Sequence, residues 1–384
     1  MKGWLLLAAC SSLAAFPGAL LTAAYTFYAV EESPSWLALS AVVVLPSFFA
    51  AFSKLWGFLA DRFGARKLFI LLGWFSSAFA LIPPLFEPCF ETVFISGVVG
   101  SALWSVGAPA LTAEVMGVKK QGTRLGVWRS LGNAAYLAGV ACAGALYDAV
   151  GMRGVLAVCL AIYMVAGSTV AIAYKPDRGG TERVEKSPLK DIVADLKHSL
   201  ASRRSAPLAV ATLVIWISVW SVEGLSRAKV LRVLGSEAAY SFAAAAAVAI
   251  DMLAAPLTGR FVDRCGPIAG VMLGLALHTA SGIALACLSD PLLVLIAWCV
   301  PFGYALTCSL YVAFSRVAKG LADAVGTCDT LVAVAALPAT LVASLADHLG
   351  LDAALAVLSA LSLAAIPPLA AALKSLRESK DLRA

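Results

Sequence analysis

Residues 57–67 read GFLADRFGARK, a short charged segment with a long apolar stretch on each side. This segment contains Asp61, Arg62, Arg66 and Lys67, whereas the whole chain is 61% hydrophobic and only 14% charged. Soluble proteins carry about 25% charged residues. The apolar excess falls in runs of about 18 residues or more, which is the length a helix needs to cross a bilayer. The sequence therefore predicts an integral membrane protein built of helices.

Apolar runs separated by polar interruptions predict an all-α protein with twelve membrane-spanning helices. One interruption, residues 175–205, is long, and its apolar residues recur at helical spacing between Pro188 and Leu200. This pattern predicts an amphipathic helix on the membrane surface. We expect three parts: a six-helix bundle over 1–174, a cytoplasmic linker over 175–205, and a six-helix bundle with a short cytoplasmic tail over 206–384. The predicted spans are 4–29, 36–56, 67–86, 92–115, 126–149, 153–174, 206–226, 239–261, 267–288, 291–315, 325–346 and 351–373.

The basic residues orient these helices. With both termini in the cytoplasm, all of the 29 Lys and Arg residues lie in cytoplasmic segments except Arg153, Arg227, Lys229 and Arg232. Cytoplasmic loops of membrane proteins carry an excess of basic residues. We therefore expect a multi-pass protein of the cytoplasmic (inner) cell membrane with both termini inside. The net charge of +6 reflects this topology and does not indicate a nucleic-acid partner.

The charged segment occurs twice. Residues 259–266 read GRFVDRCG, and their Gly, Asp, Arg and Gly align with those of GFLADRFG at 57–64. A second pair supports the repeat, because ALYDAVGMRGVLAV at 145–158 aligns with SLADHLGLDAALAV at 344–357. Two halves of six spans that begin and end on the same side of the membrane are parallel repeats. The chain is therefore predicted to be two homologous bundles.

The charged segment resembles the signature loop between the second and third helices of the major facilitator superfamily. The residues that carry this resemblance are Gly57, Asp61, Arg62, Gly64, Arg66 and Lys67. The second copy, Gly259-x-x-x-Asp263-Arg264-x-Gly266, lies between the eighth and ninth spans, as that family requires. It departs from the pattern after Gly266, where Pro267 stands in place of a basic residue. The resemblance implies the twelve-helix fold of the superfamily and identifies no substrate.

The resemblance also implies that the two loops form a cytoplasmic gate. Asp61 would pair with the start of the eleventh helix, and by pseudosymmetry Asp263 would pair with Arg129 at the start of the fifth helix. Four residues occupy matching positions at the inner helix ends of the two halves and complete the expected charge network: Glu114, Arg129, Arg316 and Asp329. The alternative, a basic turn that only satisfies the positive-inside rule, leaves the repeated Asp unexplained.

Two carboxyl groups within the spans are candidates for proton coupling or substrate binding. Asp251 lies in the middle of FAAAAAVAIDMLAAPLTG, and an ionisable residue at this depth is a candidate functional group. A buried carboxyl group favours its protonated form unless a cation pairs with it. Glu223 shares a helix face with Trp216 and Trp220, which suggests a binding wall for a ring or a cation. The alternatives are a structural Asp251 hydrogen-bonded to a neighbouring helix, and an interfacial aromatic belt with Glu223 paired to Arg227.

Neutral polar side chains within the spans could hydrogen-bond a solute in a central cavity. Such residues are also common as contacts between helices. The four candidates are Tyr25, Asn133, Tyr136 and Tyr304.

The sequence lacks a Walker A loop, a catalytic triad and the spacing of a metal or haem site. We therefore expect a secondary transporter, not an enzyme, that works by alternating access, without a cofactor and with a proton or sodium gradient as its energy source. Its partners would be a small-molecule substrate, a coupling ion, most simply a proton, and the lipid bilayer, and it would be a monomer. A signalling or scaffolding protein with this fold would have no need for both charged loops and Asp251.

The direction of transport is predicted from the fifth span. This span lacks the Gly-Pro element typical of drug–proton antiporters of the superfamily, and residues 124–132 resemble the start of the fifth helix in its sugar and nucleoside symporters. Both features favour proton symport, with a proton-coupled exporter of drugs or metabolites as the alternative. Because no Lys or Arg lies in the middle of a span, we expect a neutral or cationic organic solute.

Overall fold

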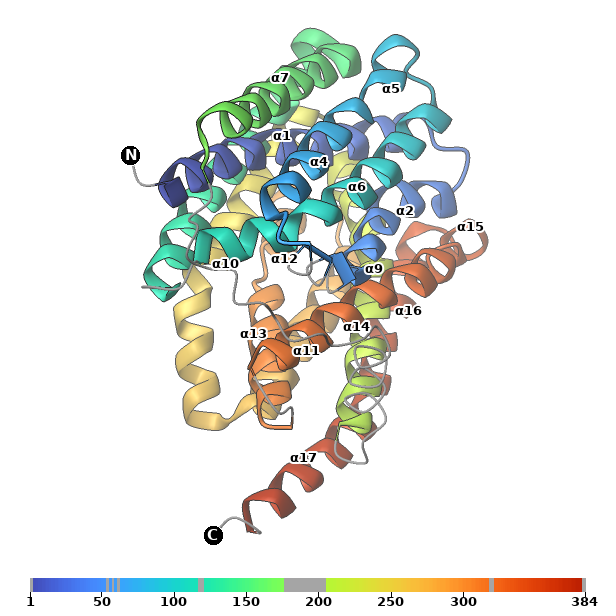
Figure 1. Ribbon diagram of the computed structural model, residues 1–384. Coiled ribbons are helices and arrows are strands. Elements are labelled where there is room, and N and C mark those ends of the chain that lie inside the picture. The colour runs from blue at the N-terminus through green and yellow to red at the C-terminus, as the bar shows by residue number, and fades with distance from the viewer. Residues whose placement is uncertain are drawn as a thin grey trace. The chain divides into compact units, whose positions relative to one another are not determined.

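The computed structural model describes residues 3–52, 55–56, 59–60, 63–116, 121–175, 205–317 and 321–381 (Figure 1). Within these ranges the regular elements are all helices. Gly57, Asp61 and Arg62 of the first charged loop lie outside the described residues, as does the amphipathic helix expected within 175–205. The predicted all-α fold is confirmed.

The chain divides into two compact units. The first unit comprises residues 1–34, 41–186 and 235–245, and the second comprises 35–40, 187–234 and 246–384. The helices of the sequence up to residue 175 are α1 (Gly3–Glu32), α2 (Trp36–Val44), the 3₁₀ helix η1 (Leu45–Phe52), α4 (Arg66–Phe79), α5 (Ile82–Phe86), α6 (Phe90–Met116) and α7 (Gln121–Ala173).

The helices after residue 205 follow the same order of spans. They are α9 (Ala206–Leu234), α10 (Glu237–Cys265), α11 (Pro267–Cys287), α12 (Pro291–Trp298), α13 (Phe302–Ser315), α14 (Leu321–Val342), α15 (Leu345–Leu349), α16 (Leu351–Leu361), the 3₁₀ helix η2 (Ser362–Ala365) and α17 (Ile366–Asp381).

Ten helical stretches within the described residues are long and apolar enough to cross a membrane. The stretch Leu131–Ala173 is 43 residues long and covers two predicted spans, and the shorter apolar stretch Trp36–Phe52 falls within another. The largest differences from the predicted boundaries are at two helix ends, because α9 continues to Leu234 instead of ending at 226 and α17 continues to Asp381 instead of ending at 373. The last turns of α9 carry basic side chains, and these have partners within the second unit that keep the helix intact.

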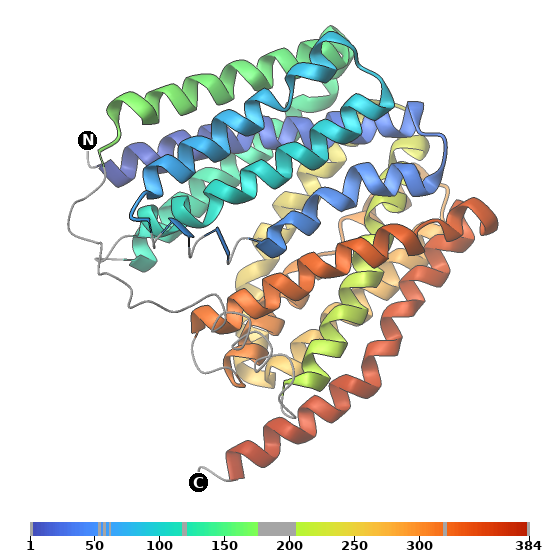
Figure 2. The same cartoon turned by 45° about the vertical axis from the view of Figure 1, so that its right-hand side comes forward.

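Each unit packs its long helices side by side (Figure 2). In the first unit α1 lies along α7 and α4 lies along α6, around a core that includes Leu7, Ile70 and Trp74. In the second unit α9 lies against α14 and α16, and α11 lies against α13 and α16. Because lipid is as apolar as these side chains, close packing and hydrogen bonds, more than burial from water, hold such helices together.

The repeat detected in the sequence is visible in the backbone. Gly151 interrupts α7 with φ 65° and ψ −176°, and Gly350 separates α15 from α16 with φ 80° and ψ 162°. These two glycines occupy the same position in the aligned segments 145–158 and 344–357. Only glycine enters this region of φ and ψ at low cost. The same one-residue turn therefore joins the fifth to the sixth span and the eleventh to the twelfth.

The second unit includes the first turn of α2. The backbone N–H of Trp36 donates to Asp347 Oδ1 at 2.8 Å, and that of Leu37 donates to Asp347 Oδ2 at 3.4 Å. The guanidinium carbon of Arg232 lies 4.7 Å from the centroid of the Trp36 ring, within range of a cation–π contact. A carboxylate on α15 thus caps the N-terminus of a helix more than 300 residues earlier in the sequence.

The first unit correspondingly includes the first turns of α10. The Tyr240 ring meets the Phe27 ring edge-on at 5.4 Å, and the Gly144 N–H donates to Ser241 Oγ at 2.7 Å. A Cβ atom at Gly144 would lie 2.2 Å from the carbonyl oxygen of Glu237, so this contact requires glycine. The second and eighth spans therefore exchange their first turns between the two sequence halves.

We expect replacement of the turn glycine Gly350 by Ala to destabilise the second unit by about 1–3 kcal/mol, because its φ and ψ are accessible only to glycine. Gly132→Ala is the matched control, since Gly132 lies inside α7 and a Cβ atom there meets nothing within 4 Å. Thermal unfolding of the purified protein should show a lower midpoint for Gly350→Ala and an unchanged or higher midpoint for Gly132→Ala. Equal midpoints would contradict the turn assignment.

Candidate functional site

The Asp251 carboxylate lies within α10 of the second unit, in a half-buried position. Its Oδ1 atom is buried and has no hydrogen-bond partner among the described residues. Its Oδ2 atom would lie 3.5 Å from a Cβ atom built on Gly303, the second residue of α13. The hydrogen bond to a neighbouring helix that would make Asp251 purely structural is thus absent for Oδ1 within the described part of the chain.

The tenth span is broken next to Asp251. Helix α12 ends at Trp298, α13 begins at Phe302, and between them the Phe302 N–H donates to the Val300 carbonyl at 2.9 Å. Pro301 has no N–H, so the Ala297 carbonyl lacks its helical donor and accepts from Ser281 Oγ on α11 at 2.7 Å. No side chain in the described part of the protein caps the start of α13. Asp251 therefore lies beside a helix N-terminus, where backbone N–H groups and the helix dipole favour a negative charge.

Glu223 is engaged by the residue one helical turn further along α9. Arg227 Nη2 lies 2.5 Å and Nε lies 3.0 Å from Glu223 Oε1. This is the ion pair that the i, i+4 spacing offered as the alternative to a binding wall. Because the pair neutralises Glu223, Asp251 is the carboxyl group of this region without a basic partner among the described residues.

The side chains of Trp216 and Trp220 on α9 pack within the second unit. Their rings lie 5.5 Å apart at 43°. The Trp220 indole N–H donates to the Val332 carbonyl on α14 at 2.9 Å, whereas the buried Trp216 N–H has no partner among the described residues. Trp216 belongs to the apolar core of the unit. Trp220 therefore joins α9 to α14, a contact that the sequence did not indicate, and the binding-wall role of the two tryptophans stays a prediction.

The four neutral candidates fall into two groups. Tyr25 is buried on α1, and its hydroxyl is 3.0 Å from Ser96 Oγ on α6, so it joins two helices. Asn133 and Tyr136 on α7 and Tyr304 on α13 are half-buried and have no hydrogen-bond partner among the described side chains. Tyr304 follows Gly303 directly and is therefore close in sequence to the contact with Asp251. These three residues can offer hydrogen bonds to a polar solute.

The described residues of the first charged loop form a brace, a set of hydrogen bonds to other parts of the first unit. Gly64 has φ 60°, and the Ala65 N–H donates to the Ala60 carbonyl at 3.1 Å, the bond that closes a Schellman helix end. Lys67 Nζ donates to the carbonyl oxygens of Ala171 at 2.9 Å and Tyr174 at 2.6 Å. A lysine thus satisfies the last carbonyls of α7, which have no helical donors.

Arg66 and Glu114 form the second part of this brace. Arg66 Nη1 lies 3.4 Å from Glu114 Oε1, and the Tyr174 hydroxyl donates to Glu114 Oε2. The predicted network member Glu114 therefore joins α4 to the end of α7 within the first unit. Sequence reasoning missed Tyr174, for which the only available signal was an aromatic residue at the end of the sixth span.

The second charged loop is built differently. Gly266 has φ 89° and is followed by Pro267 at the first position of α11, so α10 and α11 meet at one residue. Asp263, Arg264 and Arg316 are exposed. A Cβ atom at Gly259 would contact nothing within 4 Å, so this glycine makes no close helix approach.

Asp329, in the first half of α14, has a partner within the second unit. It accepts from the Tyr311 hydroxyl at 2.5 Å, which joins α13 to α14. The expected pair of Asp263 with Arg129 stays a prediction, because the Arg129 side chain lies outside the described residues.

The basic side chains near the end of α9 all have intramolecular partners. Arg227 pairs with Glu223, Lys229 Nζ lies 2.8 Å from Asp352 Oδ1 on α16, and Arg232 covers the Trp36 ring. Lys229 is buried although it is charged. These three cations therefore contribute to the structure of the second unit and are not available to an anionic ligand.

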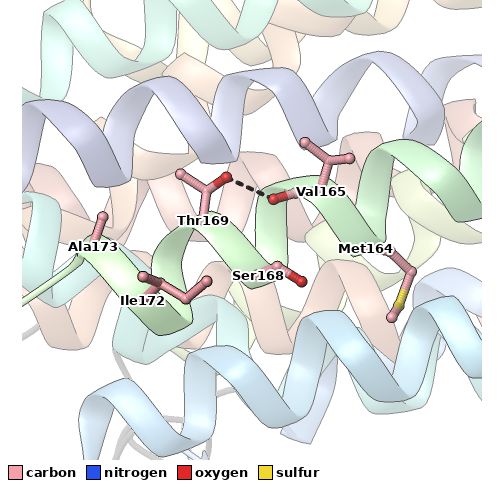
Figure 3. A pocket seen from close by; sticks show the side chains of 6 residues that line it. All are labelled: Met164, Val165, Ser168, Thr169, Ile172 and Ala173. Carbon is pink, nitrogen blue, oxygen red and sulfur yellow. Dashed lines mark hydrogen bonds between the residues drawn. The ribbon is translucent and has the colours of Figure 1, made fainter.

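A shallow groove on α7 differs from the charged regions described above in the kind of side chain that lines it (Figure 3). Its one side-chain hydrogen bond joins Thr169 Oγ1 to the Val165 carbonyl at 2.8 Å, and Ile172 is 83% exposed. The residues that line it are Met164, Val165, Ser168, Thr169, Ile172 and Ala173. None of them is ionisable, so this groove suits lipid acyl chains better than a polar solute.

The fold agrees with comparisons to known proteins. The model of the Major Facilitator Superfamily matches residues 5–326, and the chain belongs to this family. It is therefore a membrane transporter and not an enzyme. None of the curated protein sequences matches the chain.

Solved structures of transporters share the fold at low sequence identity. A crystal structure of the nucleoside transporter NupG (D323A mutant) has a TM-score of 0.82 at 13% identity and covers 96% of this chain and 100% of its own. A POT family transporter in complex with 5-aminolevulinic acid has a TM-score of 0.75 at 13% identity, with 95% and 94% covered. A bacterial homologue of the human lysosomal transporter Spinster has a TM-score of 0.71 at 14% identity, with 98% and 96% covered.

Removing the Lys67 ammonium should destabilise the first unit, because two carbonyl groups at the end of α7 would lose their donor. We expect Lys67→Met to cost about 1–3 kcal/mol, as hydrogen bonds to charged groups typically do. Arg264→Met removes an exposed base from the second loop and should change stability by less than about 0.5 kcal/mol. Thermal unfolding in detergent measures both, and a Lys67→Met protein as stable as Arg264→Met would show that the brace contributes nothing.

Proposed function

We propose that the protein is a secondary active transporter that carries a small neutral or cationic organic solute across the cytoplasmic membrane by alternating access, in symport with protons. Both termini would lie in the cytoplasm. The observation that carries the proposal is Asp251, a carboxylate within a spanning helix that has one buried oxygen without a hydrogen-bond partner among the described residues. Ionisable residues at such positions mark ion and substrate pathways.

The surroundings of Asp251 favour a proton over a sodium ion. A sodium ion needs several oxygen ligands, as hard cations generally do. Beside Asp251 the chain presents the N-terminus of α13, whose backbone N–H groups attract an anion and not a cation. A proton needs only one carboxylate oxygen.

The position of Asp251 also supplies a way to couple proton binding to movement. The α13 N-terminus favours the ionised carboxylate, and burial without a hydrogen-bond partner disfavours it. The two effects oppose each other at the same group. A change in the distance between Asp251 and the start of α13 would therefore change the free energy of protonation. Alternating access would provide this change when the tenth span moves.

The described polar groups support a neutral or cationic solute. Asn133, Tyr136 and Tyr304 offer neutral hydrogen bonds, and the basic side chains of α9 are paired. A dianionic solute would need unpaired cations in the site. Nucleosides, the substrates named for NupG, are neutral and are the first solutes to test.

Uptake into proteoliposomes tests the proposal with the Asp251→Asn variant. Candidate solutes, nucleosides first, would be selected by the thermal stabilisation they confer on the purified protein. An inward proton gradient should drive accumulation by the unchanged protein, and Asp251→Asn should lower this accumulation by about tenfold or more, equivalent to about 1.4 kcal/mol. Exchange of labelled for unlabelled solute without a gradient should survive.

Asp148→Asn is the matched control, because Asp148 is exposed just before the Gly151 break in α7 and the substitution is the same. It should leave gradient-driven uptake unchanged. Full proton-driven accumulation by Asp251→Asn would refute a coupling role for Asp251. Proton-driven loss of solute from the vesicles would show that the protein is an exporter.

A further inference from the structure

His278 is a buried ionisable residue that the proposed site does not use. It lies on α11 with 1% of its surface exposed. Its Nε2 atom is 3.0 Å from Ser218 Oγ on α9, and Ser218 Oγ donates to the Leu358 carbonyl on α16 at 2.6 Å. A hydroxyl group has a single proton, and Leu358 receives it. Ser218 must therefore accept from His278, which assigns the hydrogen to Nε2 and joins three helices through one imidazole.

The same imidazole contacts the break in the tenth span. The ring centroids of His278 and Phe302 are 4.9 Å apart, with the ring planes at 59°. Phe302 is the first residue of α13, and the next residue, Gly303, is the one that meets Asp251 Oδ2. A continuous chain of contacts therefore runs from Ser218 through His278 and Phe302 to Asp251.

The start of α13 has few hydrogen-bond restraints of its own, although the Phe302 side chain also packs against the apolar core of the unit. Pro301 supplies no N–H, and no side chain of the described residues caps the helix. The backbone bond between Phe302 and Val300 spans only two residues. The Phe302 side chain consequently depends on its neighbours for its position, and His278 is a neighbour fixed by a hydrogen bond to another helix.

We propose that His278 is a positioning residue: its hydrogen bond to Ser218 holds the imidazole against Phe302, and this contact holds the start of α13 beside Asp251. The inference rests on the proposed role of Asp251 in coupling. It gives the ninth span, which does not carry the site, control over how readily Asp251 accepts a proton. Among the described residues, the titratable groups of other elements that interact electrostatically with Asp251 are Glu223, which is paired with Arg227, and Cys299, directly after α12.

Labelling of Asp251 by dicyclohexylcarbodiimide tests the inference without a known substrate. This apolar reagent reacts with protonated carboxyl groups, and mass spectrometry of the purified full-length protein measures the labelled fraction of Asp251 as a function of pH. In His278→Leu the pH of half-maximal labelling should rise by about half a unit or more, because release of the α13 N-terminus removes the dipole that favours the ionised carboxylate. His278→Gln keeps an N–H donor for Ser218 and should shift less.

Thr279→Val is the matched control. Thr279 is also buried on α11, and its hydroxyl lies 2.8 Å from Ser362 Oγ, so the variant removes a hydrogen bond between helices without touching Phe302. Its labelling profile should match that of the unchanged protein. A purely structural role for His278 would lower thermal stability in both variants and shift neither profile, and that result would overturn the proposal.

Two further outcomes keep the inference separate from the proposed function. If His278→Leu does not fold, Ser218→Ala removes the acceptor with a smaller change and should shift the profile in the same direction; an unshifted Ser218→Ala profile would overturn the inference. If Asp251 in the unchanged protein shows no pH dependence between about pH 5 and 9, the proposed coupling role fails and the inference fails with it.

Discussion

Hydrocarbon offers no hydrogen bonds, so a chain that crosses a bilayer must satisfy its backbone N–H and C=O groups internally. In this protein the side chains at helix ends do much of that work. Asp347 accepts from the first N–H groups of α2, Lys67 donates to the last carbonyls of α7, and Ser281 replaces the donor that Pro301 lacks. The start of α13 is one of several helix ends in the described part of the chain that no side chain caps. It is the one beside which the Asp251 carboxylate lies, and this makes it the candidate location for chemistry.

Much of the fold could be predicted because its signals are local. Apolar runs located the spans, and the aligned segments anticipated the matching turns at Gly151 and Gly350. The ion pair of Glu223 with Arg227 followed from spacing on one helix, although the sequence alone left it as an alternative. In each of these cases either the interacting groups are close along the chain, or the same turn occurs at matching positions of the sequence repeat.

The remaining features depend on partners that are distant in sequence. No local pattern connects Trp36 to Asp347, or His278 to Ser218 and Leu358. Lys67 illustrates what the sequence does not reveal. Its positive charge is consistent with the expected cytoplasmic gate, but its hydrogen bonds are to carbonyl groups at the end of α7, and they depend on where that helix ends. The choice between a contact residue and a substrate ligand for Tyr25 likewise depended on Ser96 lying opposite it.

The two halves repeat the charged-loop motif but differ at the position of Asp251. When the motif glycines Gly57 and Gly259 are aligned, Phe49 stands opposite Asp251. Phe49 belongs to the 3₁₀ segment Leu45–Phe52, in which three phenylalanine rings contact one another, whereas Asp251 belongs to a regular α-helix. Duplication supplies the same helical scaffold twice. A substitution can then introduce a charged residue in one half, while the residue at the matching position of the other half keeps its packing role.

The exchanged first turns of α2 and α10 bear on how such a protein can be assembled. If the chain were made as two separate polypeptides divided within residues 176–204, neither would contain a complete unit. The first would leave the glycine surface at Gly144 uncovered, and the second would leave Asp347 without the helix that it caps. Each fragment would carry the piece that completes the other. The contacts at Gly144 and at Asp347 can therefore form only when both fragments are present.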